Sequence, residues 1–95
     1  MTDTVRHEPE RMRYVLERDG EVIGLTSYRQ ADSEIRITHT EIQPVLRGQG
    51  LGGVMVQQVL DDLRATTDAA IVPVCPFVDR WIGDHREYQD LLSRR

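Results

Sequence analysis

A glycine-rich segment, Arg47–Gly53, constrains the fold of this chain more than any other feature. It places four glycines in seven residues, directly before a run with the apolar spacing of an amphipathic helix. Glycine lets backbone N–H groups approach a ligand with no Cβ in the way, and the first turn of a helix leaves N–H groups unpaired beside a partial positive charge. The segment therefore predicts an anion site for phosphate or pyrophosphate, with Arg47 as an added cation. A turn that only permits tight helix packing is the alternative.

Two well-known phosphate-binding motifs do not fit this segment. It formally satisfies G-x-G-x-x-G, but a dinucleotide-binding fold needs repeated βαβ units and a carboxylate after the second strand. Here one short strand follows, and it ends in Val74-Cys75-Pro76. A nucleotide P-loop needs a lysine after its last glycine, and this sequence contains no lysine.

The first half of the chain predicts an antiparallel meander. Met12, Tyr14 and Leu16 alternate with Arg13 and Glu17, and the segments 22–29 and 34–42 are also typical of strands. Asp19-Gly20 is a favoured hairpin turn, and Gly24 inside the second strand indicates a bulge or a close backbone approach. In the third strand, simple alternation puts four residues on one face: Ile35, Ile37, His39 and Glu41.

The second half predicts a βα crossover and further helix. Apolar residues recur at helical spacing from Leu51 to Leu63, including Val54, Met55, Val59 and Leu60, and the helix should fade near Thr66. Residues 69–74 are typical of a strand buried on both faces. Pro76 suits a helix start, and this last helix should break at Gly83 and resume through Tyr88. The fold class is therefore α/β (α+β), with a mixed sheet in one domain over residues 1–95, of which residues 1–10 are expected to be poorly ordered.

Composition narrows the function classes. Twelve Lys and Arg residues against 16 Asp and Glu give a net charge of −4, which argues against a nucleic-acid partner. The longest apolar stretch, 69–78, contains two prolines and is too short to cross a membrane. The polar N-terminus is not a signal peptide, and one cysteine with three scattered histidines predicts no metal site. We therefore expect a cytoplasmic protein.

The segment from Ile42 to Gly52 resembles the acetyl-CoA signature of the Gcn5-related N-acetyltransferases. Their Arg/Gln-x-x-Gly-x-Gly/Ala pattern is met by Arg47, Gly50 and Gly52, and the preceding apolar-x-Pro by Ile42 and Pro44. The segments 73–78 and 85–88 resemble a compact subfamily of about this length, although Arg86 stands where a proline is more usual. The resemblance spans roughly residues 10–92.

This resemblance implies a minimal acyl-CoA N-acyltransferase fold, with acetyl-CoA as cosubstrate and a primary amine as acceptor. The pantetheine arm would bond to backbone near Ile42 and Val45, the pyrophosphate would lie on the N–H groups of residues 47–53, and the Ile42 N–H would face the developing oxyanion. The expected cofactor-binding residues are Ile42, Val45, Arg47, Gly48, Gln49, Gly50, Leu51, Gly52 and Gly53.

Three residues are candidates for catalysis. Cys75 lies between two prolines at a predicted helix start, where a thiolate is stabilised. It could be an acetyl-accepting nucleophile, a proton donor to departing CoA, or a buried structural thiol. Glu41 and His39 precede the glycine segment, and either could take the proton of the amine. A solvated strand face is the alternative for both.

The short N-terminal region leaves little chain to cover the acceptor, which favours a protruding amine. A non-catalytic acyl-CoA binding or sensing module is the alternative function, and an interaction domain without a small ligand is a third. We expect a monomer or a weak homodimer.

Overall fold

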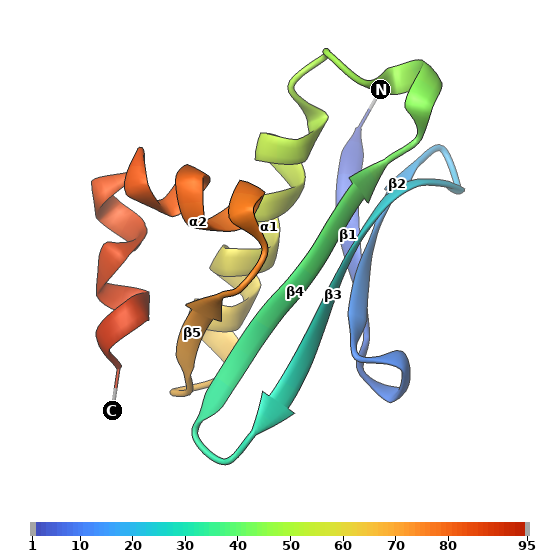
Figure 1. Cartoon of the computed structure of the whole chain (residues 1–95). Helices are drawn as coiled ribbons and strands as arrows, with labels where there is room; N and C mark the ends of the chain where they lie inside the picture. The colour runs from blue at the N-terminus through green and yellow to red at the C-terminus, as the bar shows by residue number, and fades with distance from the viewer. Residues whose placement is uncertain (1, 95) are drawn as a thin grey trace.

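The computed structural model describes residues 2–94, and its helices cover one face of a mixed five-stranded sheet (Figure 1). The strands are β1 (Asp3–Glu8), β2 (Arg13–Arg18), β3 (Glu21–Ala31), β4 (Glu34–Ile42) and β5 (Ala70–Pro73). The α-helices are α1 (Leu51–Thr66) and α2 (Pro76–Gly83), and the short 3-10 helices are η1 (Pro9–Arg11), η2 (Pro44–Leu46) and η3 (Arg86–Ser93). The predicted α/β class is confirmed.

The strands follow one another across the sheet in chain order. β1 to β4 are antiparallel neighbours, and β5 lies parallel to β4 at the opposite edge from β1. α1 connects β4 to β5, as the predicted crossover requires (Figure 1). The segment predicted to resume as helix after Gly83 is the 3-10 helix η3.

α1 packs against the sheet through one apolar stripe. Its buried residues are Leu51, Met55, Val56, Val59, Leu60 and Leu63. The predicted stripe contained Val54 in place of Val56, and Val54 is exposed in the structure. The residues buried from α2 and η3, Val78, Ile82, Tyr88 and Leu91, belong to the same core.

Residues 3–8 form β1, where the sequence predicts a poorly ordered segment. Val5 is the only apolar residue of this strand, so the strand has no periodicity to detect. Polar contacts hold it instead. The Gln58 side chain of α1 accepts from the Val5 N–H at 3.0 Å and donates to the Asp3 carbonyl at 2.8 Å, and Arg18 pairs with Asp3 at 2.7 Å. Long-range contacts of this kind cannot be inferred from local pattern.

A β-bulge in β4 changes which residues face the helices. Ser27 of β3 pairs with His39 and Tyr28 pairs with Ile37, so Thr38 is an extra residue. After such an insertion, the side chains that would have faced one side of the sheet face the other side. Ile35 and Ile37 are buried, whereas His39 and Glu41 are exposed. The prediction that these four residues share one face is therefore wrong, and Thr40 and Ile42 take the inward positions.

Gly24 occupies a place with no room for a side chain. An added Cβ would lie 2.7 Å from Ile42 Cδ1 and 2.9 Å from the Glu41 carbonyl oxygen. The neighbouring register shift in β3 confirms the bulge that Gly24 indicated. Because Gly24 has no side chain, β3 can lie close to the end of β4 at Glu41 and Ile42.

We predict that Gly24→Ala lowers the free energy of unfolding by about 1–3 kcal/mol, because overpacking against backbone forces strain. Gly83→Ala is the control, since nothing lies within 4 Å of an added Cβ at the end of α2, and it should leave stability unchanged or slightly higher. Urea denaturation of both variants measures the difference. Equal stabilities would show that the β3–β4 approach is not tight.

Candidate functional site

The site begins where β4 and β5 separate. Their pairing ends at Ile37 and Pro73, with a last hydrogen bond from the Cys75 N–H to the Ile37 carbonyl at 2.9 Å. β4 continues to Ile42 without a strand on that side. A main-chain edge over residues 38–42 is therefore left unpaired by the sheet.

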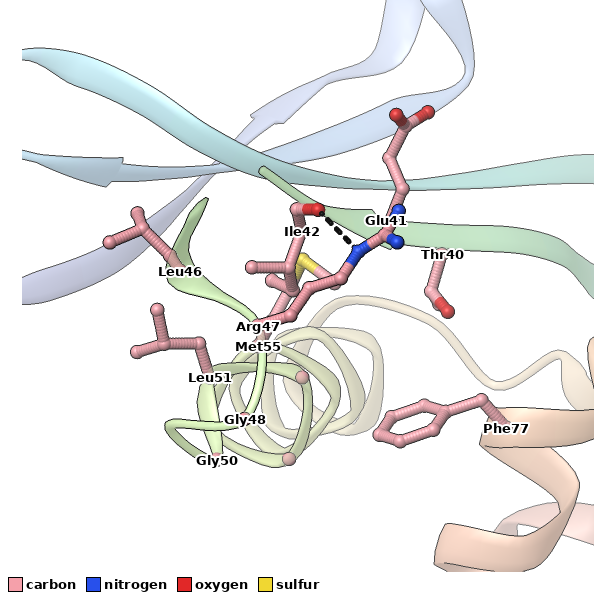
Figure 2. Close-up of a pocket in the computed structure, with 12 residues that line it drawn as sticks. Thr40, Glu41, Ile42, Leu46, Arg47, Gly48, Gly50, Leu51, Met55 and Phe77 are labelled. Carbon is pink, nitrogen blue, oxygen red and sulfur yellow. Dashed lines mark hydrogen bonds between the residues drawn. The ribbon is translucent and has the colours of Figure 1, made fainter. Parts of the chain in front are cut away.

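The backbone of Ile42 is turned toward this open edge. The Gln43 N–H donates to the Ile23 carbonyl of β3 at 2.9 Å. Because backbone groups alternate in direction along an antiparallel strand, the N–H and C=O of Ile42 point away from β3. Figure 2 shows the Ile42 carbonyl accepting from Arg47 Nε, at 3.4 Å, which agrees with this direction.

A pocket of about 360 Å³ lies between this edge and the start of α1. Residues at the end of β4 form one wall and residues at the start of α1 form the facing wall, with the Phe77 ring of α2 at one side (Figure 2). Its lining residues are Thr40, Glu41, Ile42, Leu46, Arg47, Gly48, Gly50, Leu51, Gly52, Gly53, Met55 and Phe77.

The start of α1 has the properties of an anion site. Gly50 is the N-cap residue, with φ of 78°, and no side chain caps the helix. The first turn contains no acidic residue. The N–H groups of Leu51, Gly52 and Gly53 therefore keep the unpaired donors and partial positive charge of a helix N-terminus. Gly48, with φ of 86°, gives the preceding loop its shape.

The four glycines have different roles. Gly48 and Gly50 adopt positive φ, and nothing lies within 4 Å of an added Cβ at either residue. At Gly52, an added Cβ would lie 2.8 Å from the Phe77 ring, and at Gly53 it would lie 3.3 Å from Trp81 Nε1. The first pair thus shapes the loop, and the second pair lets α1 pack closely on α2. The packing alternative is confirmed at Gly52 and Gly53, whereas the anion site stays a prediction.

Cys75 lies beside the pocket but does not line it. It is 7% exposed, and its Sγ is 3.6 Å from Oγ1 of Thr40, a residue that does line the pocket. Burial raises the pKa of the Cys75 thiol, but the backbone amides of Val78, Phe77 and Thr40 and the Thr40 hydroxyl favour the thiolate. The net result is a pKa below the ordinary value, as expected at a helix start.

Glu41 and His39 form a pair on the face of the sheet away from α1. His39 Nε2 lies 3.2 Å from Glu41 Oε1, and their side chains are 58% and 54% exposed. Glu41 lines the pocket. Figure 2 shows its carboxylate directed away from the start of α1.

The pocket contains most of the residues expected to bind the cofactor. Val45 and Gln49 are absent from its lining, and Val45 is 82% exposed. Of the catalytic candidates, Glu41 lines it and Cys75 and His39 do not. The sequence reading missed Thr40, Leu46, Met55 and Phe77. Thr40 faces the pocket because of the bulge, which the sequence pattern does not reveal. Phe77 could have been predicted, because it directly follows Pro76 at the predicted helix start.

No helix in the described part of the chain is long and apolar enough to cross a membrane. Residues 2–94 hold no group of three or more His, Cys, Asp or Glu side chains arranged to bind a metal ion.

Solved structures resemble this fold. The NMR solution structure of a GCN5-like protein from Staphylococcus aureus superposes with a TM-score of 0.68 at 24% identity, covering 92% of this chain and 84% of that one. A protein of the GNAT family from Bacteroides thetaiotaomicron aligns with a TM-score of 0.46 at 22% identity, covering 80% of this chain and 44% of that one. No curated protein matches the chain.

The comparison with protein families matches the model described as GCN5-related N-acetyl-transferase over residues 13–91. This range includes β2 to β5, α1, α2 and the whole pocket. The protein therefore belongs to the family of GCN5-related N-acetyltransferases.

Proposed function

We propose that the protein transfers an acetyl group from acetyl-CoA to a primary amine. The observation that carries this proposal is that one pocket joins two sets of main-chain donors, the uncapped start of α1 and the open edge of β4. CoA combines a pyrophosphate with a linear amide-containing arm, so its two parts need these two kinds of surface. Family membership supports the reaction class.

The residues of the α1 start fit a pyrophosphate. The N–H groups of Leu51, Gly52 and Gly53 supply hydrogen-bond donors to anionic oxygens. The open space above Gly48 and Gly50 admits such a group close to the backbone. Arg47 lines the same pocket and supplies a cation. Its contact with the Ile42 carbonyl is a weak one at 3.4 Å, so the guanidinium can turn toward the phosphates.

The β4 edge fits the amide-containing arm and the reacting carbonyl. The C=O and N–H of Ile42 face the open edge, where they can pair with an extended chain as a neighbouring strand would. The Ile42 N–H is the proposed donor to the oxyanion that develops during acyl transfer. When acetyl-CoA is bound it supplies the thioester that the amine attacks.

Glu41, with His39 as its partner, is the proposed base for the amine. Glu41 lines the pocket, and its exposed carboxylate lies at the border of that pocket, directed away from the start of α1 (Figure 2). It can therefore accept the ammonium proton directly or through a water. His39 holds the carboxylate at 3.2 Å without lining the pocket. We therefore propose His39 as a positioning residue.

Cys75 is proposed as a proton donor that acts through Thr40. A nucleophile must reach the thioester carbon, and Cys75 is buried outside the pocket lining. Thr40 Oγ1 lies in the pocket and 3.6 Å from the sulfur. When the carbon–sulfur bond breaks, the electron pair stays on the leaving sulfur, which takes a proton from Thr40 Oγ1 while Thr40 takes one from Cys75 Sγ. The lowered pKa of Cys75 favours this direction.

We predict that Gly50→Ala weakens CoA binding about tenfold or more, because hydrogen bonds to a charged group contribute roughly 1.5–3 kcal/mol. Gly20→Ala is a matched control. Gly20 also has positive φ, with no atom within 4 Å of an added Cβ, but it does not line the pocket. Both variants should lose similar stability, and calorimetric titration with CoA should separate them. Equal affinities would remove the glycine loop from the site.

We predict that Cys75→Ala and Thr40→Val each lower kcat for acetyl transfer about a hundredfold, within the range of general acid catalysis, and leave the Kd for CoA unchanged. Release of CoA thiol in the presence of amines measures the transfer. CoA binding without any transfer by the unaltered protein would favour the alternative, a non-catalytic acyl-CoA binding module. Unchanged kcat in both variants would remove the proton relay.

The pH profile gives a further prediction. A proton donor must be protonated, so kcat should fall as pH rises through the pKa of Cys75. An ordinary cysteine thiol has a pKa of about 8.5. Because the pKa of Cys75 is lowered, the fall in kcat should begin at a lower pH than it would for an ordinary thiol. The Cys75→Ala variant should keep a low kcat that does not decrease over the same pH range. A profile that keeps the same upper limb in Cys75→Ala would assign that limb to another group.

A further inference from the structure

A second hollow, of about 210 Å³, lies next to Glu41. Its lining residues are Val22, Ile23, Gly24, Leu25, Glu41, Gln43 and Pro44. Glu41 lines both this hollow and the larger pocket at the open edge of β4. Glu41 therefore separates the two cavities, with its carboxylate directed away from the start of α1 (Figure 2).

The hollow opens on the face of the sheet that the helices leave uncovered. An added Cβ at Gly24 would point toward Met55 of α1, at 3.4 Å from its sulfur. Because successive strand residues point to opposite faces, Leu25 points away from α1. Glu41 is the partner of Leu25 across β3 and β4 and shares that face. A ligand can therefore approach Glu41 from outside without displacing a helix.

Charge on this face favours a cation at Glu41. The other strand carboxylates on the same face are neutralised by arginines: Glu8 by Arg6 and Arg13, Glu17 by Arg6, and Glu34 by Arg36. Among the residues that the structure describes, Glu41 forms its ion pair with His39, and its side chain remains 54% exposed. Among the described residues, an ammonium group arriving from solvent therefore finds an accessible carboxylate that forms no ion pair with an arginine.

The other walls of the hollow favour an apolar substituent on that ammonium. Leu25 and Pro44 line it, and Val22 is a large apolar side chain left 41% exposed. The hollow is smaller than the cavities that hold drug-sized ligands. A carboxylate at the far end of the ligand's chain would lose water against these apolar walls, which costs free energy.

We propose that this hollow is the acceptor subsite, and that the acceptor is a small primary amine with an unbranched apolar chain and no carboxylate. The proposal rests on the proposed acetyl transfer. The ammonium lies at Glu41, which takes its proton, and the chain lies along Val22 and Leu25. Nitrogen forms the new bond to the acetyl carbon as the carbon–sulfur bond breaks.

The test compares propylamine, hexylamine and aminohexanoate as acceptors at saturating acetyl-CoA. Each methylene that enters the hollow should raise kcat/KM by up to about fourfold. Hexylamine should therefore exceed propylamine about tenfold or more, and aminohexanoate, of the same length, should lose most of this gain. Transfer that is indifferent to chain length, or that favours aminohexanoate, would overturn the subsite and leave the acetyl transfer standing.

Two variants locate the effect. Val22→Thr places a hydroxyl in the wall and should lower kcat/KM for hexylamine several-fold while propylamine is little affected. Leu92→Thr is the control, because Leu92 is similarly exposed, at 39%, but lies in η3 away from the hollow. Equal losses for both amines in Val22→Thr would contradict the proposal.

Binding provides a readout that does not depend on turnover. Hexylamine added to the CoA complex should shift the backbone amide NMR signals of Val22, Leu25 and Glu41 more than those of η3. Such shifts without any acetylation would support the subsite and contradict the transferase. Acetylation of hexylamine without these shifts would contradict the subsite alone.

Discussion

The site depends on the point at which β4 and β5 stop pairing. The two strands share hydrogen bonds only as far as Ile37 and Pro73, and the Thr38 bulge follows immediately in β4. Beyond the bulge β4 runs on for several residues with one edge open. If β5 continued to pair with β4, the N–H and C=O of Ile42 would form hydrogen bonds within the sheet. Because β5 turns into α2 instead, those groups remain available to a ligand.

The same departure brings together the other parts of the site. α2 starts directly after β5, and its Phe77 packs against Gly52 at the start of α1. The two helix starts therefore lie close together at the open edge. Neither has a side-chain cap, and Cys75 is the N-cap residue of α2. A Cβ at position 52 would lie 2.8 Å from the Phe77 ring, so glycine lets the ring take this place. The closely spaced glycines thus give the loop before α1 its positive φ angles at Gly48 and Gly50 and let α1 pack on α2 at Gly52 and Gly53.

Much of this architecture could be predicted from the sequence. Periodicity identified the meander and α1, and Pro76 marked the start of α2. The glycine segment indicated where the pocket and the uncapped start of α1 lie. These features are local, since each depends on residues within a few positions of one another.

The parts that the sequence did not predict depend on contacts between distant residues. β1 is held by Gln58 and Arg18, which carry no strand signal of their own. The bulge at Thr38 reversed the faces of His39 and Glu41, so alternation alone placed them on the helix side. Thr40 entered the pocket for the same reason. One inserted residue therefore separates the predicted face of His39 and Glu41 from the observed face.

Amide hydrogen exchange in the presence of CoA tests the central claim, that main-chain groups at the α1 start and the β4 edge hold the ligand. At a CoA concentration shown by calorimetry to saturate the protein, exchange should slow at Leu51, Gly52, Gly53 and Ile42. Full binding of CoA with unchanged exchange at all four amides would contradict the account.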